Sequence, residues 1–444
     1  MNIKVKRVLV RIGLVLLVII VLALGVRAVF NFTTGKKLQA YLERSKSEGM
    51  VMSLKDLAPN CDDPDNAALL WKAAEALFLT PDTEGKTLIK QTIEGFFYGR
   101  PLQEESRAKL APLIERNRKV LDLIVEAAGR PCFRYGDWKK RPYSIDPSNA
   151  VKMILAIRLL GINTVLRAEA GQVQTALDEL RQGMRFIRRT IDEPILINNL
   201  VALANMKSLL NCFGQIVKGR EMDPAILSAW IKELDPEAWR TKFWRCVETE
   251  RALALETGLG VVKGDKDILR AEARGNRLYY WLIRPIQKLQ IIWVQDMFKE
   301  SNKMARVPYY QIKELTKEKQ TMRESAPWYF KLSGLLLVDF QSVFLKEATL
   351  EAMMLTTKAG LACKIYKNET GHYPENLEAL VPDFMDALPT DPFTGKPLIY
   401  RLQDSGVLIY SVGSNEKDDE GRGTYQITQL VMEKYDDDWA WKEK

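Results

Sequence analysis

The arrangement of apolar and polar residues sets the N-terminal end apart from the rest of the chain. Residues 8–32 are apolar except for two arginines and one asparagine, and residues 12–26 carry no charge. Those fifteen residues would span about 22 Å as a helix. A hydrocarbon core of about 30 Å therefore also needs the apolar flanks, with Arg11 and Arg27 extending to the head groups. We expect a retained transmembrane helix, and the alternative is a signal peptide cleaved at residues 23–25 (Ala-Leu-Gly).

From Lys36 to Glu369 the apolar spacing is mostly that of amphipathic helices. Asp65 and Asn66 are suited to cap the N-terminus of one helix, and Ser148 is suited to cap another, which ends at Gly171. Further helices are expected at residues 194–218, 224–234, 237–256 and 267–300.

Two helices in this region form a predicted pair. The helix that ends at Gly171 and the following stretch, residues 172–191, together resemble one tetratricopeptide-like hairpin, with small residues at Ala176 and Gly183. No second copy follows at the same period, so two amphipathic helices of a bundle are the alternative.

Residues 279–298 are rich in aromatic and aliphatic side chains. We expect a buried core helix with a kink at Pro285, and the alternative is a helix on the membrane surface or in a partner's groove. A more regular helix follows, with one continuous stripe of mostly small residues. The stripe consists of Leu345, Ala348, Ala352, Leu355, Ala359, Ala362 and Tyr366.

Prolines and glycines break the helical pattern after this stripe. Gly371 ends the helix, and residues 388–392 (Leu-Pro-Thr-Asp-Pro) have the composition of a turn. Two β-rich runs follow at residues 398–402 and 407–412, and we expect them to form a hairpin. The alternating run at residues 424–430 is the expected third strand of a small antiparallel sheet.

Charge limits the classes of partner. The chain has 444 residues and a net charge of +8, but residues 1–50 alone hold nine Lys/Arg and two Glu. The remaining 394 residues therefore carry a net charge of only +1. A nucleic-acid-binding domain would present a basic patch on its folded surface, so we expect no nucleic acid partner.

The five cysteines are far apart in the sequence and form no CxxC pair, so zinc-site spacing is absent. An odd number of cysteines leaves at least one thiol unpaired within the chain. We expect buried thiols, with one disulfide between Cys61 and Cys132 as an open alternative.

The C-terminal part resembles the globular domain of the major pseudopilin of type II secretion systems, over about 70 residues. That family has an aliphatic helix, a Tyr-Pro step, a Leu-Pro-x-Asp-Pro turn, a Gly-x-Pro turn, paired strands and a Ser-x-Gly turn. The resemblance implies a small pilin-like sheet module that packs on the preceding helix. The matching residues are Tyr366, Gly371, Tyr373, Pro374, Leu388, Pro389, Asp391, Pro392, Gly395, Pro397, Tyr400, Ser411 and Gly413.

The same resemblance implies a cation site. In the family, the loop after the Ser-x-Gly turn binds calcium, and Asn415 stands at the position of its first aspartate. Asp418 and Asp419 supply further oxygen atoms, which hard cations prefer. The family's downstream aspartate has no acidic counterpart at residues 424–428, so a solvated acidic turn is the alternative. No other cofactor is expected.

The rest of the chain departs from the pseudopilins. Residues 1–33 lack the processed leader and the glutamate of that family, so we expect no filament subunit. The layout is instead similar to that of membrane-anchored envelope proteins of bacteria with a Pro-x-x-Asn-Ala-Ala helix start. Residues 63–68 (Asp-Pro-Asp-Asn-Ala-Ala) resemble this start, with one residue fewer between Pro64 and Asn66. His372 is the only histidine and lies in a turn, without a nucleophile or metal motif around it.

The sequence therefore predicts a mostly α-helical, non-enzymatic protein of the inner (cytoplasmic) membrane, with one span and a large extracytoplasmic part. Its expected partners are the membrane, through residues 8–32, and envelope or secretion-system proteins, in an interaction role linked to secretion or surface assembly. A helical scaffold with a purely structural C-terminal cap and a hydrolase without a recognisable motif are the alternatives. The expected divisions are a cytoplasmic tip and anchor at 1–33, a helical body at 34–333, a long helix with the pseudopilin-like module at 334–435, and a tail at 436–444.

Overall fold

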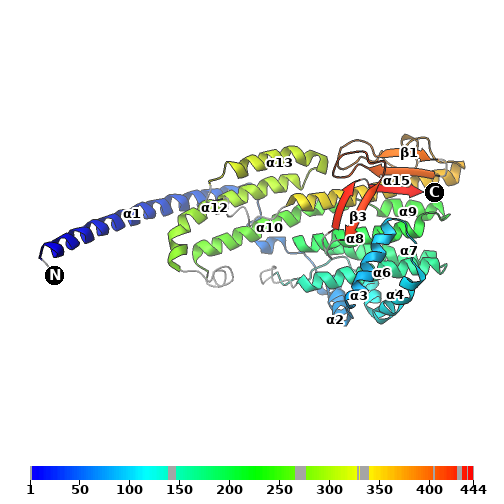
Figure 1. The fold of residues 1–444 in the computed structure, drawn as a ribbon, viewed down its shortest axis with the longest axis horizontal. Helices are drawn as coiled ribbons and strands as arrows, with labels where there is room; N and C mark the ends of the chain where they lie inside the picture. The colour runs from blue at the N-terminus through cyan, green and yellow to red at the C-terminus, as the bar shows by residue number, and fades with distance from the viewer. Residues whose placement is uncertain are drawn as a thin grey trace. The chain divides into compact units, whose positions relative to one another are not determined.

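A computed structural model describes residues 3–138, 147–265, 277–327, 330, 340–403, 406–427, 433–437 and 439–443 (Figure 1). The chain groups into two compact units. Unit 1 comprises Met1–Asp56, Glu250–Ser301 and Glu318–Val338, and unit 2 comprises Leu57–Thr249, Asn302–Lys317 and Asp339–Lys444. The boundary expected between residues 333 and 334 lies outside the described residues.

Unit 1 contains one long exposed helix and parts of three others. The helix α1 (Ile3–Ser47) is an uninterrupted helix of 45 residues. Its large apolar side chains from Ile12 to Val26 are 46 to 71% exposed. This helix is long and apolar enough to cross a membrane, and a signal sequence would have the same features. The other helices with residues in unit 1 are α10 (Glu237–Lys263), α12 (Arg277–Met304) and α13 (Tyr309–Glu324).

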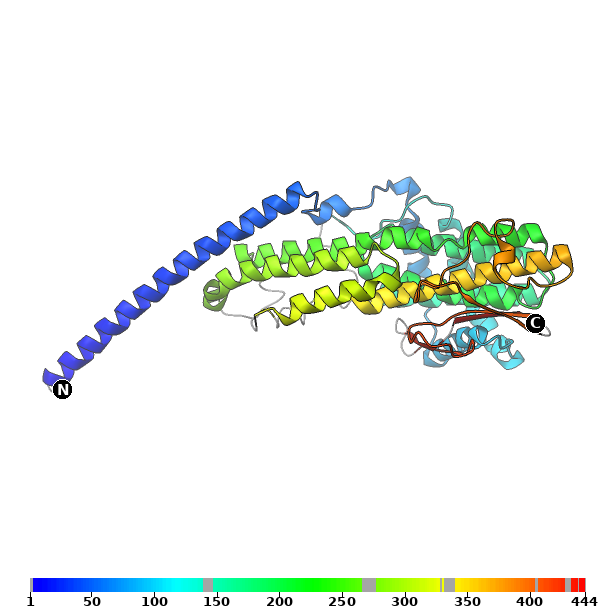
Figure 2. The same ribbon diagram turned by 90° about the horizontal axis from the view of Figure 1, so that it is seen from above.

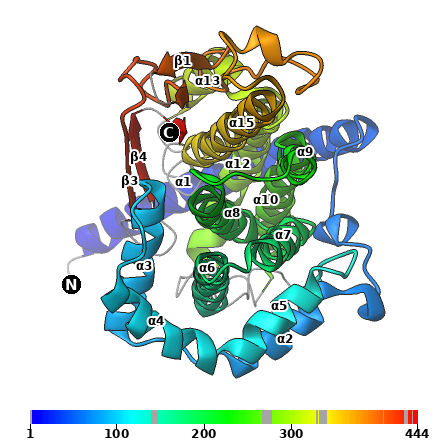
Figure 3. The ribbon, with the colours of Figure 1, turned by 90° about the vertical axis from the view of Figure 1, so that its right-hand side faces the viewer.

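Unit 2 is built around α8 (Leu196–Val217), which has other helices on several sides in Figure 3. This helix is also apolar and long enough to cross a membrane, but 89% of its apolar window is buried inside the fold, so it is a core helix. Its neighbours include α6 (Pro147–Glu169), α7 (Val173–Thr190), α9 (Pro224–Glu233) and α15 (Phe340–Thr370), and a peripheral row consists of α2 (Ala67–Leu77), α3 (Thr83–Phe97), α4 (Glu104–Arg116) and α5 (Arg118–Ala127). Short 3₁₀ turns occur at Leu54–Leu57, Asp63–Asp65 and Glu378–Leu380.

The helical pair predicted at residues 148–191 is present as α6 and α7, which pack against each other and against α8. Small residues bring these helices together. A Cβ atom at Gly161 of α6 would lie 2.7 Å from the sulfur of Cys212, which belongs to α8. The absence of a side chain at this position therefore sets the close approach of the two helices.

The sheet near the C-terminus has the expected number of strands and the expected hairpin. Strands β1 (Ile399–Gln403) and β2 (Gly406–Ser411) pair in antiparallel fashion. The third strand is β5 (Trp439–Glu443), which pairs with the other edge of β2. The run at 424–430 was expected to be this third strand. Its described residues instead belong to β3 (Gly423–Ile427), which pairs with β4 (Glu433–Asp437) in a separate two-stranded sheet, and residues 428–430 lie outside the described part.

This correction has a physical reason. The strand β2 is buried at every position, so its two faces need apolar contacts and its two edges need backbone hydrogen-bond partners. The strand β5 brings Trp441 opposite Ile409, and this tryptophan is only 3% exposed. Burial of this large aromatic side chain thus favours β5, and not the alternating run at 424–430, as the third strand of the sheet.

The small-residue stripe on α15 is confirmed as the packing face of that helix. Ala348, Ala352, Ala359 and Ala362 are at most 2% exposed. Figures 1 and 2 show the C-terminal strands beside α15, and both β2 and β5 contact it. At Gly360 the contact is so close that a Cβ atom would lie 2.3 Å from Nε1 of Trp441. The sheet therefore shares one hydrophobic core with the helices of unit 2.

Candidate functional site

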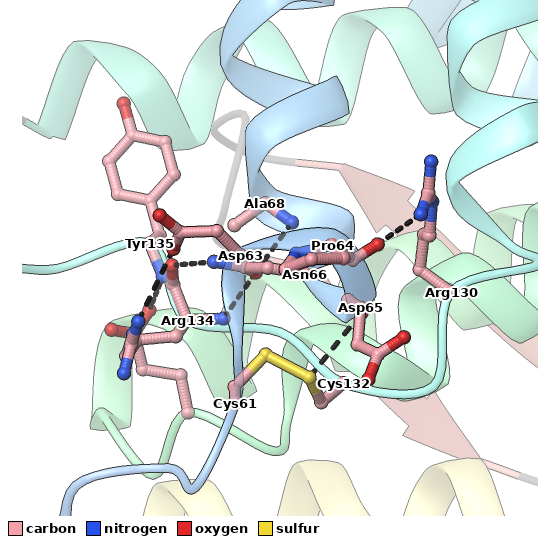
Figure 4. The surroundings of a disulfide bond; sticks show 11 residues. Cys61, Asp63, Pro64, Asp65, Asn66, Ala68, Arg130, Cys132, Arg134 and Tyr135 are labelled. Atoms are coloured by element: carbon pink, nitrogen blue, oxygen red, sulfur yellow. Dashed lines mark hydrogen bonds and ion pairs between the residues drawn. A yellow bond between two sulfur atoms is a disulfide. The ribbon is translucent and has the colours of Figure 1, made fainter.

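A disulfide holds the start of α2 against the segment that follows α5 (Figure 4). Cys61 and Cys132 are bonded at an S–S distance of 2.01 Å, which confirms the pairing left open by the sequence. The other cysteines, Cys212, Cys246 and Cys363, are buried and form no disulfide. Burial in apolar surroundings raises the pKa of the Cys363 thiol to about 12, so this thiol is not a reactive nucleophile at neutral pH.

Asn66 joins the same two segments beside the disulfide (Figure 4). Its side-chain oxygen accepts hydrogen bonds from Ala68 N at 3.0 Å and from Arg134 N at 2.9 Å, and its amide donates to Arg134 O at 2.9 Å. The backbone adds a bond from Ala67 N to Cys132 O at 2.9 Å. The predicted N-cap is therefore confirmed, and the same side chain also fixes a loop distant in sequence.

Two arginines complete this arrangement at the surface (Figure 4). Arg130 donates to the carbonyl oxygen of Pro64, and Arg134 forms an ion pair with Asp63 at 3.4 Å. Such exposed pairs contribute little free energy, so the disulfide and Asn66 account for most of the rigidity of this corner. The Asp-Pro-Asp-Asn-Ala-Ala motif thus has a structural explanation.

A buried carboxylate fixes the next part of this loop. Glu193 is fully buried and accepts hydrogen bonds from Gly136 N and Trp138 Nε1, both at 2.8 Å, and from Tyr135 N at 3.2 Å. Asn198 donates a fourth bond at 3.1 Å. Burial raises the pKa of Glu193, while these donors favour its charged form. Sequence reasoning missed this residue, because nothing near Glu193 in the sequence marks its partners.

A groove of about 630 Å³ runs between α9, α15 and the loop at residues 382–390 of unit 2. Its walls combine charges of both signs with apolar side chains, which suits the binding of an extended segment with mixed polarity. The charged lining residues are Lys232, Lys358, Glu351, Glu369, Asp383 and Asp386.

A second hollow, of about 20 Å³, has room for roughly one water molecule and is lined by two acidic residues of α15. Burial raises the pKa of Glu347 to about 8, with a further contribution from the charge of Glu351. Burial also raises the pKa of Glu351, and Arg240, 3.9 Å away, opposes that rise. At neutral pH this pair therefore holds a proton on Glu347.

The residues proposed for calcium lie in one exposed loop, where Asn415 and Asp419 contact each other and Asp418 contacts other residues. The Asp418 carboxylate accepts hydrogen bonds from Tyr410 Oη and from Arg401, each at 2.8 Å. Asn415 donates its amide to Asp419 at 2.8 Å. Among the residues that the structure describes, no group of three or more His, Cys, Asp or Glu side chains is arranged to hold a metal ion. Calcium binding at this loop stays a prediction.

Asp391 and Ser411, two other motif residues of the C-terminal module, contact each other. Asp391, in the Leu-Pro-x-Asp-Pro turn, is 2% exposed and accepts hydrogen bonds from Phe393 N at 2.8 Å and Val412 N at 3.0 Å. Ser411 Oγ donates a third bond to it at 3.0 Å, so the turn is tied to the end of β2. His372 is exposed, and its Nδ1 lies 3.0 Å from the carbonyl oxygen of Tyr373.

Comparison with known proteins adds no assignment to this geometry. No protein-family model, curated protein or solved structure matches the chain.

Proposed function

We propose that this protein is a single-pass, membrane-anchored envelope protein whose folded units lie on the oxidising side of the inner membrane, where they bind other proteins. In this proposal α1 remains attached to the chain as the anchor. The basic N-terminal residues stay in the cytoplasm. The partners belong to the secretion or surface-assembly machinery that the resemblance of the C-terminal module to pseudopilins implies.

The observation that carries the proposal is the Cys61–Cys132 disulfide in a chain that begins with an exposed apolar helix. Disulfides persist in extracytoplasmic compartments and are rare in a reducing cytoplasm. The balance of Lys and Arg around the uncharged segment gives only a weak orientation. Lys4, Lys6, Arg7 and Arg11 precede it, and Arg27, Lys36 and Lys37 follow it. In this proposal the disulfide supports one direction, because an oxidising compartment outside the cytoplasm would preserve it in unit 2.

A binding role accounts better than catalysis for the polar groups described above. Asn66, Glu193 and Asp391 all use their side-chain oxygens to hold backbone segments together. The groove between α9, α15 and residues 382–390 offers an open, mixed-charge surface instead. This groove is the surface we assign to the protein partner.

A specific observation also favours the second candidate, a scaffold whose C-terminal sheet is a structural cap. Leu398, Ile409 and Trp441 belong to the same hydrophobic core as the helices of unit 2. The sheet therefore contributes to the stability of that unit, whether or not it also contacts a partner.

The first experiment tests the compartment and the anchor. The full chain is expressed in a bacterial host, cells are quenched with acid, and free thiols are alkylated with a mass-shifting reagent. We expect Cys61 and Cys132 to be protected until reduction, and the protein to stay in the membrane after carbonate extraction. Alkylation of all five cysteines in freshly quenched cells, instead of only Cys212, Cys246 and Cys363, would contradict the proposed orientation. A body that resists protease added to spheroplasts would contradict it as well.

The second experiment separates binding from a structural cap. A photo-crosslinking residue replaces Asp386 in the groove, and the matched control carries it at Glu84 of α3, which is exposed like Asp386. A protein-binding groove predicts adducts from position 386 alone. If neither position forms adducts and a chain ending at residue 438 no longer folds, the cap hypothesis accounts for the module.

A further inference from the structure

The beginning of α12 exposes an apolar surface that the rest of this helix does not. Leu278, Trp281 and Leu282 are 59, 37 and 50% exposed. They lie at positions i, i+3 and i+4, so they share one face of the helix. Further along α12, Ile291 and Met297 are buried in the fold. The exposed surface is therefore confined to one end of the helix.

Contacts with α1, which belongs to the same unit, show which residues of α1 lie beside this surface. The guanidinium of Arg27 lies 3.3 Å from the ring centroid of Trp281 and also donates to the carbonyl oxygen of Trp281. Lys288 Nζ donates to Asn31 O and to Asn31 Oδ1, both at 2.9 Å. Higher residue numbers of α12 thus lie beside higher numbers of α1, and the two helices run in the same direction.

This register places the start of α12 at the membrane boundary. The uncharged part of α1 ends directly before Arg27, and Trp281 lies beside that arginine. A helix rises 1.5 Å per residue, so Leu278 lies about 4.5 Å further toward the apolar side than Trp281. Tryptophan is enriched at the interface between hydrocarbon and water, because its ring is apolar and its N–H is polar.

The charges near this surface suit anionic head groups. Lys288 is close enough to Arg284 and Arg27 that both arginines lower its pKa, in addition to the larger effect of burial. Three cationic side chains therefore gather where α1 leaves the apolar layer. Clusters of this kind beside a transmembrane helix attract the phosphates of anionic lipids.

We propose that the start of α12, from Leu278 to Lys288, is a second membrane contact, which inserts Leu278, Trp281 and Leu282 into the head-group region of the bilayer that α1 crosses. The occupant of this surface is the anionic phospholipid bilayer. The proposal rests on the anchor assigned to α1, and it adds that unit 1 lies against the lipid surface instead of being connected to it by α1 alone.

The test uses the full chain in vesicles of phosphatidylcholine with about one-third phosphatidylglycerol. A nitroxide label is attached to Leu282→Cys, and its accessibility to oxygen and to a water-soluble nickel chelate gives its depth. The three cysteines outside the disulfide are buried and do not compete for the label. Leu402→Cys is the matched control, since Leu402 is similarly exposed at 54% and belongs to the C-terminal sheet.

We expect the label at residue 282 to show a several-fold lower accessibility to the nickel chelate than the label at residue 402. A label at Leu278→Cys should be buried at least as deeply. Arg284→Glu should raise the accessibility of residue 282 in the anionic vesicles, whereas Arg323→Glu, an exposed cation on α13, should leave it unchanged.

The outcomes separate this proposal from the anchor itself. A label at Leu17→Cys reports on the middle of the apolar part of α1. If residue 17 lies in the hydrocarbon while residues 278 and 282 are as accessible as residue 402, the second contact is wrong and the anchor stands. If residue 17 is also accessible to the chelate, α1 does not cross the bilayer and both proposals fail.

Discussion

Replacing both Cys61 and Cys132 with alanine removes the only cross-link in the described part of the chain and leaves the surrounding hydrogen bonds available. The two residues are 71 positions apart. A cross-link that closes a loop of this length stabilises the fold by about 4 kcal/mol in the chain-entropy model, because it restricts the unfolded chain. We expect the free energy of unfolding of unit 2 to fall by about this amount.

The nearby contacts do not replace this effect. The bonds between Asn66 and Arg134, and between Ala67 and Cys132, exist only in the folded state and contribute about 1 kcal/mol each. They hold the two segments together once the unit has folded, but they do not limit the conformations of the unfolded chain. The equilibrium constant for unfolding should therefore rise by about a thousandfold.

The assay is equilibrium unfolding in urea, followed by circular dichroism of the detergent-solubilised full chain, with and without reductant. The reduced wild type and the double variant should unfold at the same, lower urea concentration, and reductant should leave the variant unchanged. If the oxidised wild type and the variant agree within about 1 kcal/mol, the unfolded chain already keeps these segments close and the entropic reasoning is wrong.

Three further predictions concern unit 2. The pKa of Glu347 is about 8 in the folded state, against an ordinary 4.5. The free energy of unfolding should therefore fall by a few kcal/mol as pH rises from about 4.5 to about 8, because the unfolded chain ionises this carboxyl more easily than the fold does. Glu347→Gln should reduce this fall by that amount in urea titrations at pH 5 and pH 8, because only the contribution of Glu347 is lost. An unchanged pH dependence would show that Glu347 ionises freely. Gly360→Ala would place a Cβ atom 2.3 Å from Trp441 Nε1, so it should destabilise unit 2 by about 1–3 kcal/mol. Hydrogen exchange in β5 should become faster, and equal exchange in the wild type and the variant would refute the contact. Calcium binding by Asn415, Asp418 and Asp419 predicts a melting temperature that rises with calcium concentration and loses this response in Asp419→Ala; a wild type that does not respond would eliminate the site.

Features that depend on neighbouring residues could be predicted from the sequence. The apolar run of α1, the Asn66 cap of α2 and the alanine stripe of α15 each follow from the spacing or type of adjacent residues. The β1–β2 hairpin is of the same kind, since two β-rich runs are joined by a short polar turn. Such patterns reflect local backbone preferences and the period of one helix or strand.

The candidate sites could be predicted only in part. Asn66 was identifiable as a helix cap, but its hydrogen bonds with Arg134 join residues 68 positions apart. The Cys61–Cys132 pairing was one open alternative among five cysteines, and the partners of Glu193 carry no marker in the sequence. The groove beside α15 depends on how α9 and the loop at 382–390 are placed against it.

The sequence by itself determined where this chain is apolar enough to enter a membrane, which segments are helical, and where the chain turns toward strands. Only the tertiary structure decided that the tail strand with Trp441, and not the run at 424–430, completes the sheet, and that α12 begins beside Arg27. The physical reason is that a helix or hairpin is stabilised by contacts between near neighbours. The choice of a distant partner depends instead on which pairing buries the most apolar surface and satisfies the buried polar groups, and those quantities exist only once the segments are packed together.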